Sequence, residues 1–226
     1  MGDDGALIPF VNKASQVVTT DFLVEGVDFQ AGDDLALIGR KVLAVNLSDL
    51  AAMGAKPKSA LIYLAFPSKV RPAQFKRFFQ GWTNLAKQYQ VSLIGGDLSK
   101  AKEWMAGAVL IGERLLSKNF LRSSAKAGES LWVTGALGGS ILGNHFHFEP
   151  RVKEALFLNG SFPVSACIDL SDGLGADLPR LLEASGRGVS VDLGKIPVSK
   201  EAKTLSKKTL RLPLEHAFHD GEDFEL

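Results

Sequence analysis

Six short acidic clusters, most of them beside apolar runs, are the part of this sequence best suited to chemistry. Carboxylates repel one another and resist burial, so several of them beside apolar segments need cations or structural partners. Oxygen ligands without neighbouring cysteine or histidine favour Mg²⁺, Mn²⁺ or Ca²⁺ over zinc, and Mg²⁺ usually completes its shell with phosphate oxygens. The pattern therefore predicts a magnesium-dependent, phosphate-handling enzyme. The clusters occupy residues 2–4, 19–21, 46–49, 95–97, 168–173 and 220–223.

Four of these clusters have a local context that indicates how their oxygens are presented. Asp49 and Asp172 each precede a segment with helical character, so a site at a strand-to-helix junction and a simple helix cap are both open interpretations. Asp97 follows two glycines, which let a backbone approach a ligand closely. In a strand over residues 16–20, alternation would place Thr19 and Asp21 on one face and Thr20 on the other.

Other polar motifs give weaker signals. The glycine-rich turn 134–140 is suited to holding an anion, but it lacks the Gly-Lys-Ser/Thr of a P-loop and the spacing of a dinucleotide fingerprint. His145 and His147 are two residues apart and do not share a helix face, which disfavours a zinc pair. Arg122 and Arg151 can each hold a phosphate bidentately or form a surface ion pair.

Composition excludes several classes of protein. A formal net charge of +1 in 226 residues gives no sign of nucleic-acid or anionic-membrane capture, and no apolar run reaches the length of a membrane span. The single cysteine, Cys167, excludes an internal disulfide, so a cytoplasmic location is expected. The sequence starts inside a Gly-Asp-Asp turn and stops where a strand begins, so we expect a piece of a longer chain.

The elements that position these residues form two sets. Residues 72–89 are the clearest helix, with an aromatic stripe that we interpret as core, and a polar stretch at 117–129 suggests a boundary between units 1–116 and 117–226. Strands are expected at 6–10, 16–20, 41–46, 59–66, 91–95, 104–112, 131–134, 164–170 and 189–193, with a strand beginning at residue 224. Further helices are expected at 48–55, 174–184 and 199–208 and from residues 140 and 151.

Together these motifs resemble the thiamine-monophosphate kinase family, within the superfamily of aminoimidazole ribonucleotide synthetase and selenophosphate synthetase. They follow the order of the family and span almost the whole chain. The resemblance implies an α/β (α+β) fold of two PurM-like αβ domains, with mixed sheets covered by helices and the first domain mediating homodimerisation. The matching segments are 2–6, 19–29, 46–55, 94–97, 122–129, 168–174 and 221–226.

The resemblance also implies an activity and its residues. Family members transfer a phosphoryl group from ATP to thiamine monophosphate, forming thiamine diphosphate, with several Mg²⁺ ions. The family's metal ligands carry over to Asp4, Thr19, Thr20, Asp21, Asp49, Asp97, Asp169 and Asp172. Its ATP contacts carry over to Gly96, Arg122 and Ser171, and its substrate contacts to Glu222 and Asp28. Asp28 departs from the family, which usually has histidine there.

The implied mechanism explains why acids outnumber obvious proton-transfer residues. The acceptor phosphate is already anionic, so direct in-line transfer needs charge neutralisation rather than a strong base or any catalytic group beyond the metal ligands. Two other interpretations remain open. One is a different ATP-using member of the superfamily, such as selenophosphate synthetase or an amidine-forming enzyme of purine synthesis. The other is a non-catalytic metal- or nucleotide-binding module, although no EF-hand or calcium nonapeptide repeat is present.

Overall fold

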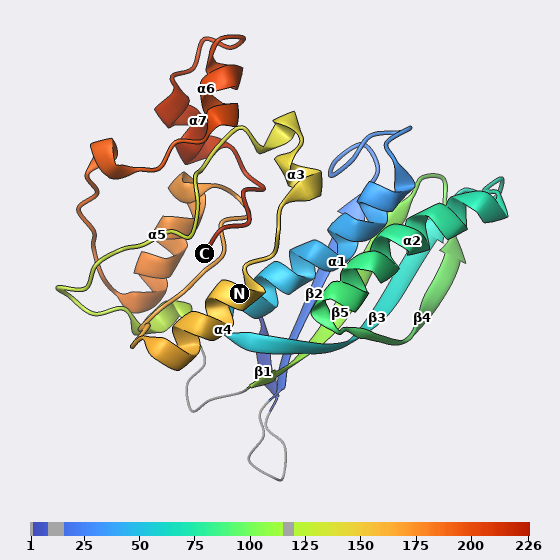
Figure 1. Cartoon of the computed structure of the whole chain (residues 1–226), viewed down its shortest axis with the longest axis horizontal. Helices are drawn as coiled ribbons and strands as arrows, with labels where there is room; N and C mark the ends of the chain where they lie inside the picture. Colours follow the sequence, from blue (N-terminus) through green and yellow to red (C-terminus); the bar gives the residue numbers. More distant parts are fainter. Residues whose placement is uncertain (1, 9–15, 115–119) are drawn as a thin grey trace.

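A five-stranded mixed sheet is the framework of the first half of the protein in this computed structural model, which describes residues 2–8, 16–114 and 120–226 (Figure 1). The strand order is β1-β2-β5-β3-β4; β3 and β4 are parallel, and the other neighbours are antiparallel. The first-half strands are therefore confirmed within the described residues, except for one segment. The strands are β1 (Ala6–Ile8), β2 (Gln16–Val24), β3 (Ala55–Phe66), β4 (Ser92–Lys100) and β5 (Met105–Arg114).

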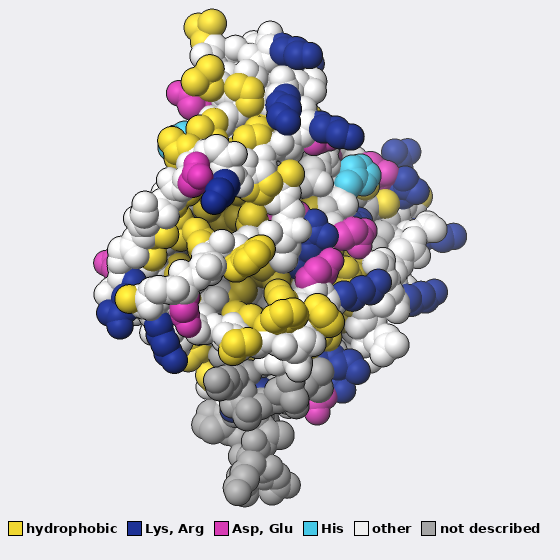
Figure 2. Space-filling view, turned by 60° about the vertical axis from the view of Figure 1, so that its left-hand side comes forward, with side chains coloured by type: hydrophobic (Ala, Val, Ile, Leu, Met, Phe, Trp, Pro, Cys, Tyr) yellow, Lys and Arg dark blue, Asp and Glu magenta, His cyan; other side chains and the backbone are white. Residues whose placement is uncertain are grey.

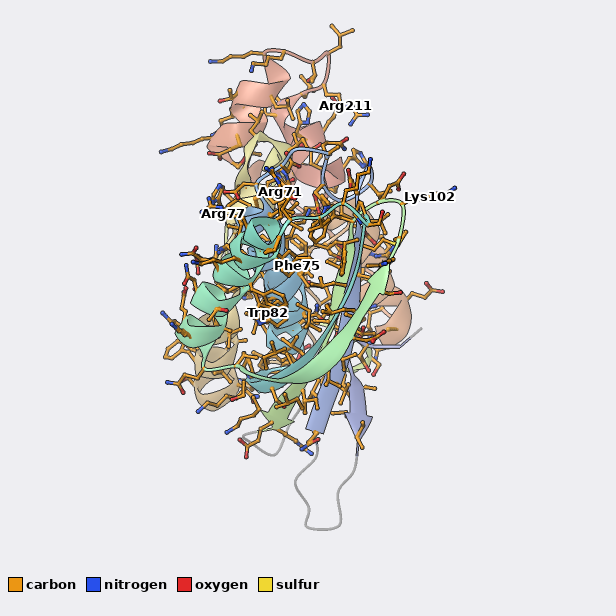
Figure 3. The ribbon with its side chains drawn as sticks, turned by 90° about the vertical axis from the view of Figure 1, so that its right-hand side faces the viewer. Arg71, Phe75, Arg77, Trp82, Lys102 and Arg211 are labelled. Atoms are coloured by element: carbon orange, nitrogen blue, oxygen red, sulfur yellow. The ribbon has the colours of Figure 1, made fainter. Side chains whose placement is uncertain are left out.

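Two long helices, α1 (Leu35–Ala52) and α2 (Pro72–Tyr89), cover one face of the sheet (Figures 1 and 3). The bounds of α2 are those expected from its periodicity, and its aromatic stripe is core, with Phe78 and Trp82 almost completely buried. Gly39 and Gly81 let the helices approach closely. A Cβ at Gly81 would lie 1.8 Å from the Ala36 carbonyl oxygen, and one at Gly39 would lie 2.1 Å from that of Phe78.

The expected strand at 41–46 is wrong, because these residues lie in the middle of α1, and the helix expected at 48–55 is the end of that same helix. Helix α1 lies between the sheet and the second half of the chain, so it is buried on nearly every side from Ile38 to Ala52. A segment that is buried on all sides is apolar on every face, so its sequence lacks the hydrophobic periodicity that distinguishes a helix from a strand. The N-cap is Asp34, whose carboxylate accepts a hydrogen bond from the Ala36 backbone N–H at 3.0 Å.

The second half is built mainly of helices joined by extended segments. The helix expected at 174–184 is confirmed as α5, the one expected from residue 151 is α4, and the one expected at 199–208 is the shorter α6. The helix expected from residue 140 is divided into a 3₁₀ turn and the short α3. Helix α7 was not expected. The helices are α3 (Asn144–His147), α4 (Val152–Ser161), α5 (Leu174–Ser185), α6 (Lys200–Ser206) and α7 (Pro213–His219), with single 3₁₀ turns η1 (Arg122–Ser124), η2 (Ser140–Leu142) and η3 (Leu193–Lys195).

The strands expected at 131–134, 164–170, 189–193 and from 224 do not form a ladder among the described residues. Extended segments nevertheless meet through individual backbone bonds: Leu170 donates to Glu225 at 2.8 Å, Phe224 donates to Leu170 at 2.8 Å, and Thr134 donates to Leu226 at 3.1 Å. Positive φ angles at Glu222 (64°) and Phe224 (51°) interrupt the extended geometry that a ladder requires. Apolar side chains gather on the outer face of this half (Figure 2). Trp132, in the second half, is 84% exposed.

The second face of the sheet is open within this chain. Thr19 and Asp21 point toward α1, whereas Thr20 and Phe22 lie on the open face, as strand alternation predicts. All nine residues of β4 are exposed, and on its outer side this edge strand has no partner among the described residues. Within the described ranges, no helix is both long and apolar enough to cross a membrane.

Gly81→Ala tests the close helix crossing. Alanine is favoured over glycine in a helix by about 1 kcal/mol, but the added methyl collides with the Ala36 backbone, which cannot rotate away. We therefore expect a net loss of at least about 2 kcal/mol of unfolding free energy in urea titration. Gly188→Ala, where nothing lies within 4 Å of the new Cβ, is the matched control. An unchanged stability of Gly81→Ala would contradict this packing.

Candidate active site

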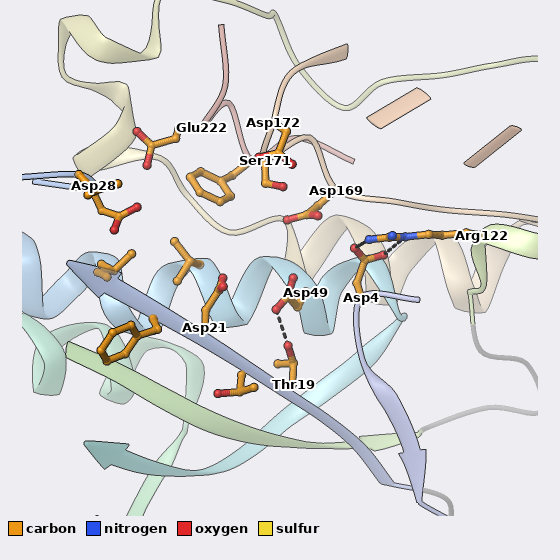
Figure 4. Close-up of a pocket in the computed structure, with 16 residues that line it drawn as sticks. Asp4, Thr19, Asp21, Asp28, Asp49, Arg122, Asp169, Ser171, Asp172 and Glu222 are labelled. Atoms are coloured by element: carbon orange, nitrogen blue, oxygen red, sulfur yellow. Dashed lines mark hydrogen bonds and ion pairs between the residues drawn. The ribbon is translucent and has the colours of Figure 1, made fainter. Parts of the chain in front are cut away.

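A pocket of about 420 Å³ opens where β2 and α1 meet the second half of the chain (Figure 4). Eleven of the thirteen predicted site residues line it, so the fold brings together side chains up to 218 positions apart in the chain, from Asp4 to Glu222. Five lining residues were not predicted: Phe22, Leu23, Val27, Val45 and Phe224. The predicted residues that line it are Asp4, Thr19, Thr20, Asp21, Asp28, Asp49, Arg122, Asp169, Ser171, Asp172 and Glu222.

Three carboxylates form the chemical centre of one end of the pocket. Asp4, Asp49 and Asp169 each offer an oxygen, and these oxygens lie within 4.8 Å of one another. Asp4 precedes β1, Asp49 lies in the last turns of α1, and Asp169 lies in the extended segment before α5. Such an all-oxygen set is typical of Mg²⁺, Mn²⁺ or Ca²⁺ sites.

Burial and mutual repulsion perturb these acids. Burial raises the pKa of Asp49 well above its usual value, and the Asp169 and Asp21 carboxylates raise it further. Burial likewise raises the pKa of Asp169, reinforced by Asp4. Burial raises the pKa of Asp21 to about 6, with contributions from Asp28 and Asp172. A bound cation would remove this repulsion, so the residues present fit a metal site.

Hydroxyl groups hold two of these acids in place. The Thr19 hydroxyl donates a hydrogen bond to Asp49, and the Ser48 hydroxyl donates to Asp169 at 2.6 Å. Asp49 lies inside α1 and Asp172 is bound by Arg180 at 2.5 Å, with Gly173 at the N-cap of α5. The helix-cap interpretation of both aspartates is therefore wrong.

The two candidate arginines lie in different places. Arg122 lines the pocket and donates through its guanidinium to Asp4, while its backbone N–H donates to Asp3 at 2.7 Å. Arg151 lies outside the pocket lining and forms an ion pair with Glu225, so it is an ion-pairing arginine, but its partner is buried and the pair is not the surface pair that was expected.

At the other end of the pocket, Asp28 and Glu222 lie near each other, away from Asp4 and Arg122 (Figure 4). The Asp28 carboxylate accepts a hydrogen bond from the Val24 backbone N–H at 2.8 Å. Glu222 forms an ion pair with Lys41, whose side chain is completely buried. Lys41 was not predicted. The sequence indicates Lys41 only by its position in the apolar run 41–47. A lysine in such a run is expected to be buried, and a buried lysine needs a polar or charged partner.

Gly96 and Asp97 are the two predicted residues that do not line the pocket. They lie on β4, paired with Ile62 and Tyr63 of β3. β3 and β5 separate them from β2, and Asp97 shares the open sheet face with Tyr63, whose hydroxyl lies 2.8 Å from that of Thr20. A single chain therefore does not bring Asp97 to the other carboxylates.

The glycine-rich turn 134–140 binds carboxylates, as expected of an anion-binding turn, but these carboxylates belong to the same chain. The Gly138 N–H donates to both Asp223 carboxylate oxygens at 3.0 and 2.9 Å, and the Gly139 N–H donates to Asp220 at 2.7 Å. Burial raises the pKa of Asp223 to about 7 despite the bond from Gly138. The sixth acidic cluster is thus divided, because only Glu222 reaches the pocket.

Comparisons with known proteins give the family. The model of AIR synthase related protein, N-terminal domain, matches residues 2–113, and that of the C-terminal domain matches residues 109–220. The thiamine-monophosphate kinase of Rhodopirellula baltica is 43% identical over 237 residues, covering 100% of this chain and 74% of the relative. The chain belongs to the thiamine-monophosphate kinase family.

Solved structures of this kinase family agree with the fold. A structure described as AaThiL complexed with AMPPCP and TMP matches with a TM-score of 0.84 and 30% identity, over 99% of this chain and 77% of the other. The thiamine monophosphate kinase of Aquifex aeolicus matches with a TM-score of 0.82 and 31% identity, over 98% and 80%. The expected α/β fold class is therefore confirmed.

Asp49→Asn tests the carboxylate cluster without reference to turnover. An amide keeps the size of the side chain and removes one repelling charge, so we expect higher thermal stability without divalent cations. We also expect the rise in melting temperature that Mg²⁺ gives the unaltered protein to be largely lost. Asp192→Asn, at an exposed acid outside the pocket, should keep that rise. A full Mg²⁺ response in Asp49→Asn would remove Asp49 from the metal site.

Proposed function

We propose that this protein is a magnesium-dependent kinase that phosphorylates thiamine monophosphate to thiamine diphosphate with ATP. The observation that supports this most directly is the pocket, which gathers an oxygen-only carboxylate cluster at one end and Asp28 and Glu222 at the other. Membership of the thiamine-monophosphate kinase family, whose relatives cover 100% of this chain, agrees with that arrangement.

The two ends of the pocket would have different roles. Asp4, Asp49 and Asp169, with Thr19, Asp21 and Asp172 beside them, would hold Mg²⁺ ions, which supply charge neutralisation for the transferring phosphoryl group. Thr20, whose hydroxyl bonds that of Tyr63 on the open face, would contribute through its backbone. Arg122 and Ser171 would contact ATP from the same end. Asp28 and Glu222 would face the cationic ring system of the acceptor, which leaves the phosphate of the acceptor toward the carboxylate cluster.

The proposed transfer is direct and in line. An anionic oxygen of the acceptor phosphate attacks the γ-phosphorus, the bond to the β–γ bridging oxygen breaks, and ADP leaves. The pocket lining contains no histidine, lysine or cysteine in the part of the chain that the structure describes. Such a lining agrees with a reaction that needs no general base, because the nucleophile is already ionised at neutral pH.

The open sheet face supports a homodimer, which we propose forms through the first unit, 1–116, while unit 117–226 closes the pocket. Phe22 on β2 and Leu61 on β3 are 45% and 37% exposed on this face, and the outer side of β4 has no strand partner among the described residues. A partner sheet on this face would cover them and enclose Gly96 and Asp97, which would then contribute to the nucleotide site. We expect the protein to act in the cytoplasm.

The activity is tested by incubating the purified protein with ATP, Mg²⁺ and thiamine monophosphate and measuring thiamine diphosphate by chromatography. We expect stoichiometric formation of thiamine diphosphate and ADP, and loss of turnover on addition of EDTA. Failure to form thiamine diphosphate while MgATP still binds would favour another ATP-using member of the superfamily. Binding of a divalent cation alone would favour a non-catalytic module.

Leu61→Lys tests the dimer. A charge on the open sheet face should oppose sheet association, so we expect a shift from dimer to monomer by light scattering. If the dimer completes the site through Asp97, turnover should fall at least about tenfold, and Asp97→Asn should also lose turnover while remaining dimeric. Leu210→Lys, at a fully exposed leucine of the second half, is the control. A Leu61→Lys protein that stays dimeric would refute this interface.

A further inference from the structure

Lys41 is a completely buried lysine that the proposed chemistry does not use. It lies on α1 among apolar neighbours, and its side chain has no exposed surface. The ammonium donates a hydrogen bond to the backbone carbonyl of Asp28 at 2.9 Å and another to the carboxylate of Glu222. It also lies 5.4 Å from the centroid of the Phe146 ring. Burying an ammonium is costly, so a lysine at this position needs these partners.

The partners of Lys41 belong to the two residues that face the acceptor end of the pocket. Asp28 is in the loop after β2, and Glu222 is 181 positions from Lys41 near the end of the chain. We propose that Lys41 is a positioning residue for the acceptor substrate, holding the Glu222 carboxylate and the Asp28 loop in the geometry that binds the cationic ring. This inference rests on the proposed function.

The backbone at Glu222 shows why an anchor is needed. Glu222 and Phe224 both have positive φ angles, 64° and 51°, a conformation that side-chain-bearing residues avoid unless their surroundings hold them. The Glu222 N–H donates to the Ser171 carbonyl at 2.7 Å, and Phe224 stacks on Phe148 with ring centroids 4.1 Å apart. These contacts fix the backbone, whereas Lys41 is the contact that fixes the Glu222 side chain.

The ion pair leaves part of the Glu222 carboxylate free for a ligand. Lys41 binds oxygen Oε1, and no protein donor binds Oε2 among the described residues. The glutamate side chain is 33% exposed and lines the pocket, while the lysine end of the pair is fully enclosed. With Asp28 beside it, the pocket retains a net negative charge at this end, which suits an acceptor with a cationic ring and N–H donors.

The test is Lys41→Met, which keeps the length and apolar stem of the side chain and removes the ammonium. Calorimetry is carried out with thiamine monophosphate in the presence of Mg²⁺ and a non-hydrolysable ATP analogue. We expect at least tenfold weaker binding of thiamine monophosphate, with binding of the ATP analogue changed less than threefold. In steady-state kinetics, KM for thiamine monophosphate should rise at least tenfold, whereas kcat should stay within threefold.

Two further variants separate positioning from a merely structural role. Glu222→Gln should weaken binding of thiamine monophosphate on its own, and Lys41→Met added to it should weaken binding less than twofold more, because the ammonium then has no carboxylate to hold. Arg40→Met is the matched control. Arg40 is the adjacent cation on α1 and donates to the Phe146 and Phe148 carbonyls, but it does not line the pocket, so binding should be unchanged.

The outcomes separate the two proposals. If the unaltered protein binds and phosphorylates thiamine monophosphate but Lys41→Met binds it equally well, the role of Lys41 is refuted and the proposed function stands. Equal weakening of thiamine monophosphate and the ATP analogue, or additive effects of Lys41→Met and Glu222→Gln, would also refute it. If the unaltered protein binds the ATP analogue but no thiamine monophosphate, the proposed function fails.

Discussion

Repulsion among carboxylates withdrawn from water is the interaction on which the rest of this structure depends. Asp4, Asp49 and Asp169 come from three distant parts of the chain, yet their oxygens lie within 4.8 Å of one another. Packing elsewhere has to hold them there, because each would be more stable ionised and apart. The hydroxyls of Thr19 and Ser48 and the guanidinium of Arg122 stabilise the arrangement locally, and the buried body of α1 supplies the rigidity.

Helix α1 explains both what the sequence predicts well and what it does not. Strands β2, β3 and β5 and helix α2 have a clear period, because each has one buried and one less buried side. Residues 41–46 lack such a period, since α1 is enclosed by the sheet and by the second half. The expected strands at 131–134 and 164–170 are extended and lie beside residues 224–226, but the positive φ angles of Glu222 and Phe224 are not visible in residue types.

The candidate site was predicted mainly by residue type and family resemblance, and the fold shows the limits of both. Acidic residues beside apolar runs identified most of the pocket lining, because buried carboxylates rarely lack a role. The same reasoning could not divide residues 220–223 into Glu222, which reaches the pocket, and Asp220 and Asp223, which bind the glycine turn. Nor could it place Gly96 and Asp97, whose strand position depends on sheet order. Lys41 was missed because a lone lysine in an apolar run has no motif.

The regular rise of α1 sets the spacing between the two ends of the pocket. Lys41, Val45 and Asp49 are spaced four residues apart and follow one side of the helix, and the last two line the pocket directly. Eight residues of α helix span about 12 Å along the axis. The carboxylate cluster and the Lys41–Glu222 pair are therefore held a fixed distance apart by a single rigid element.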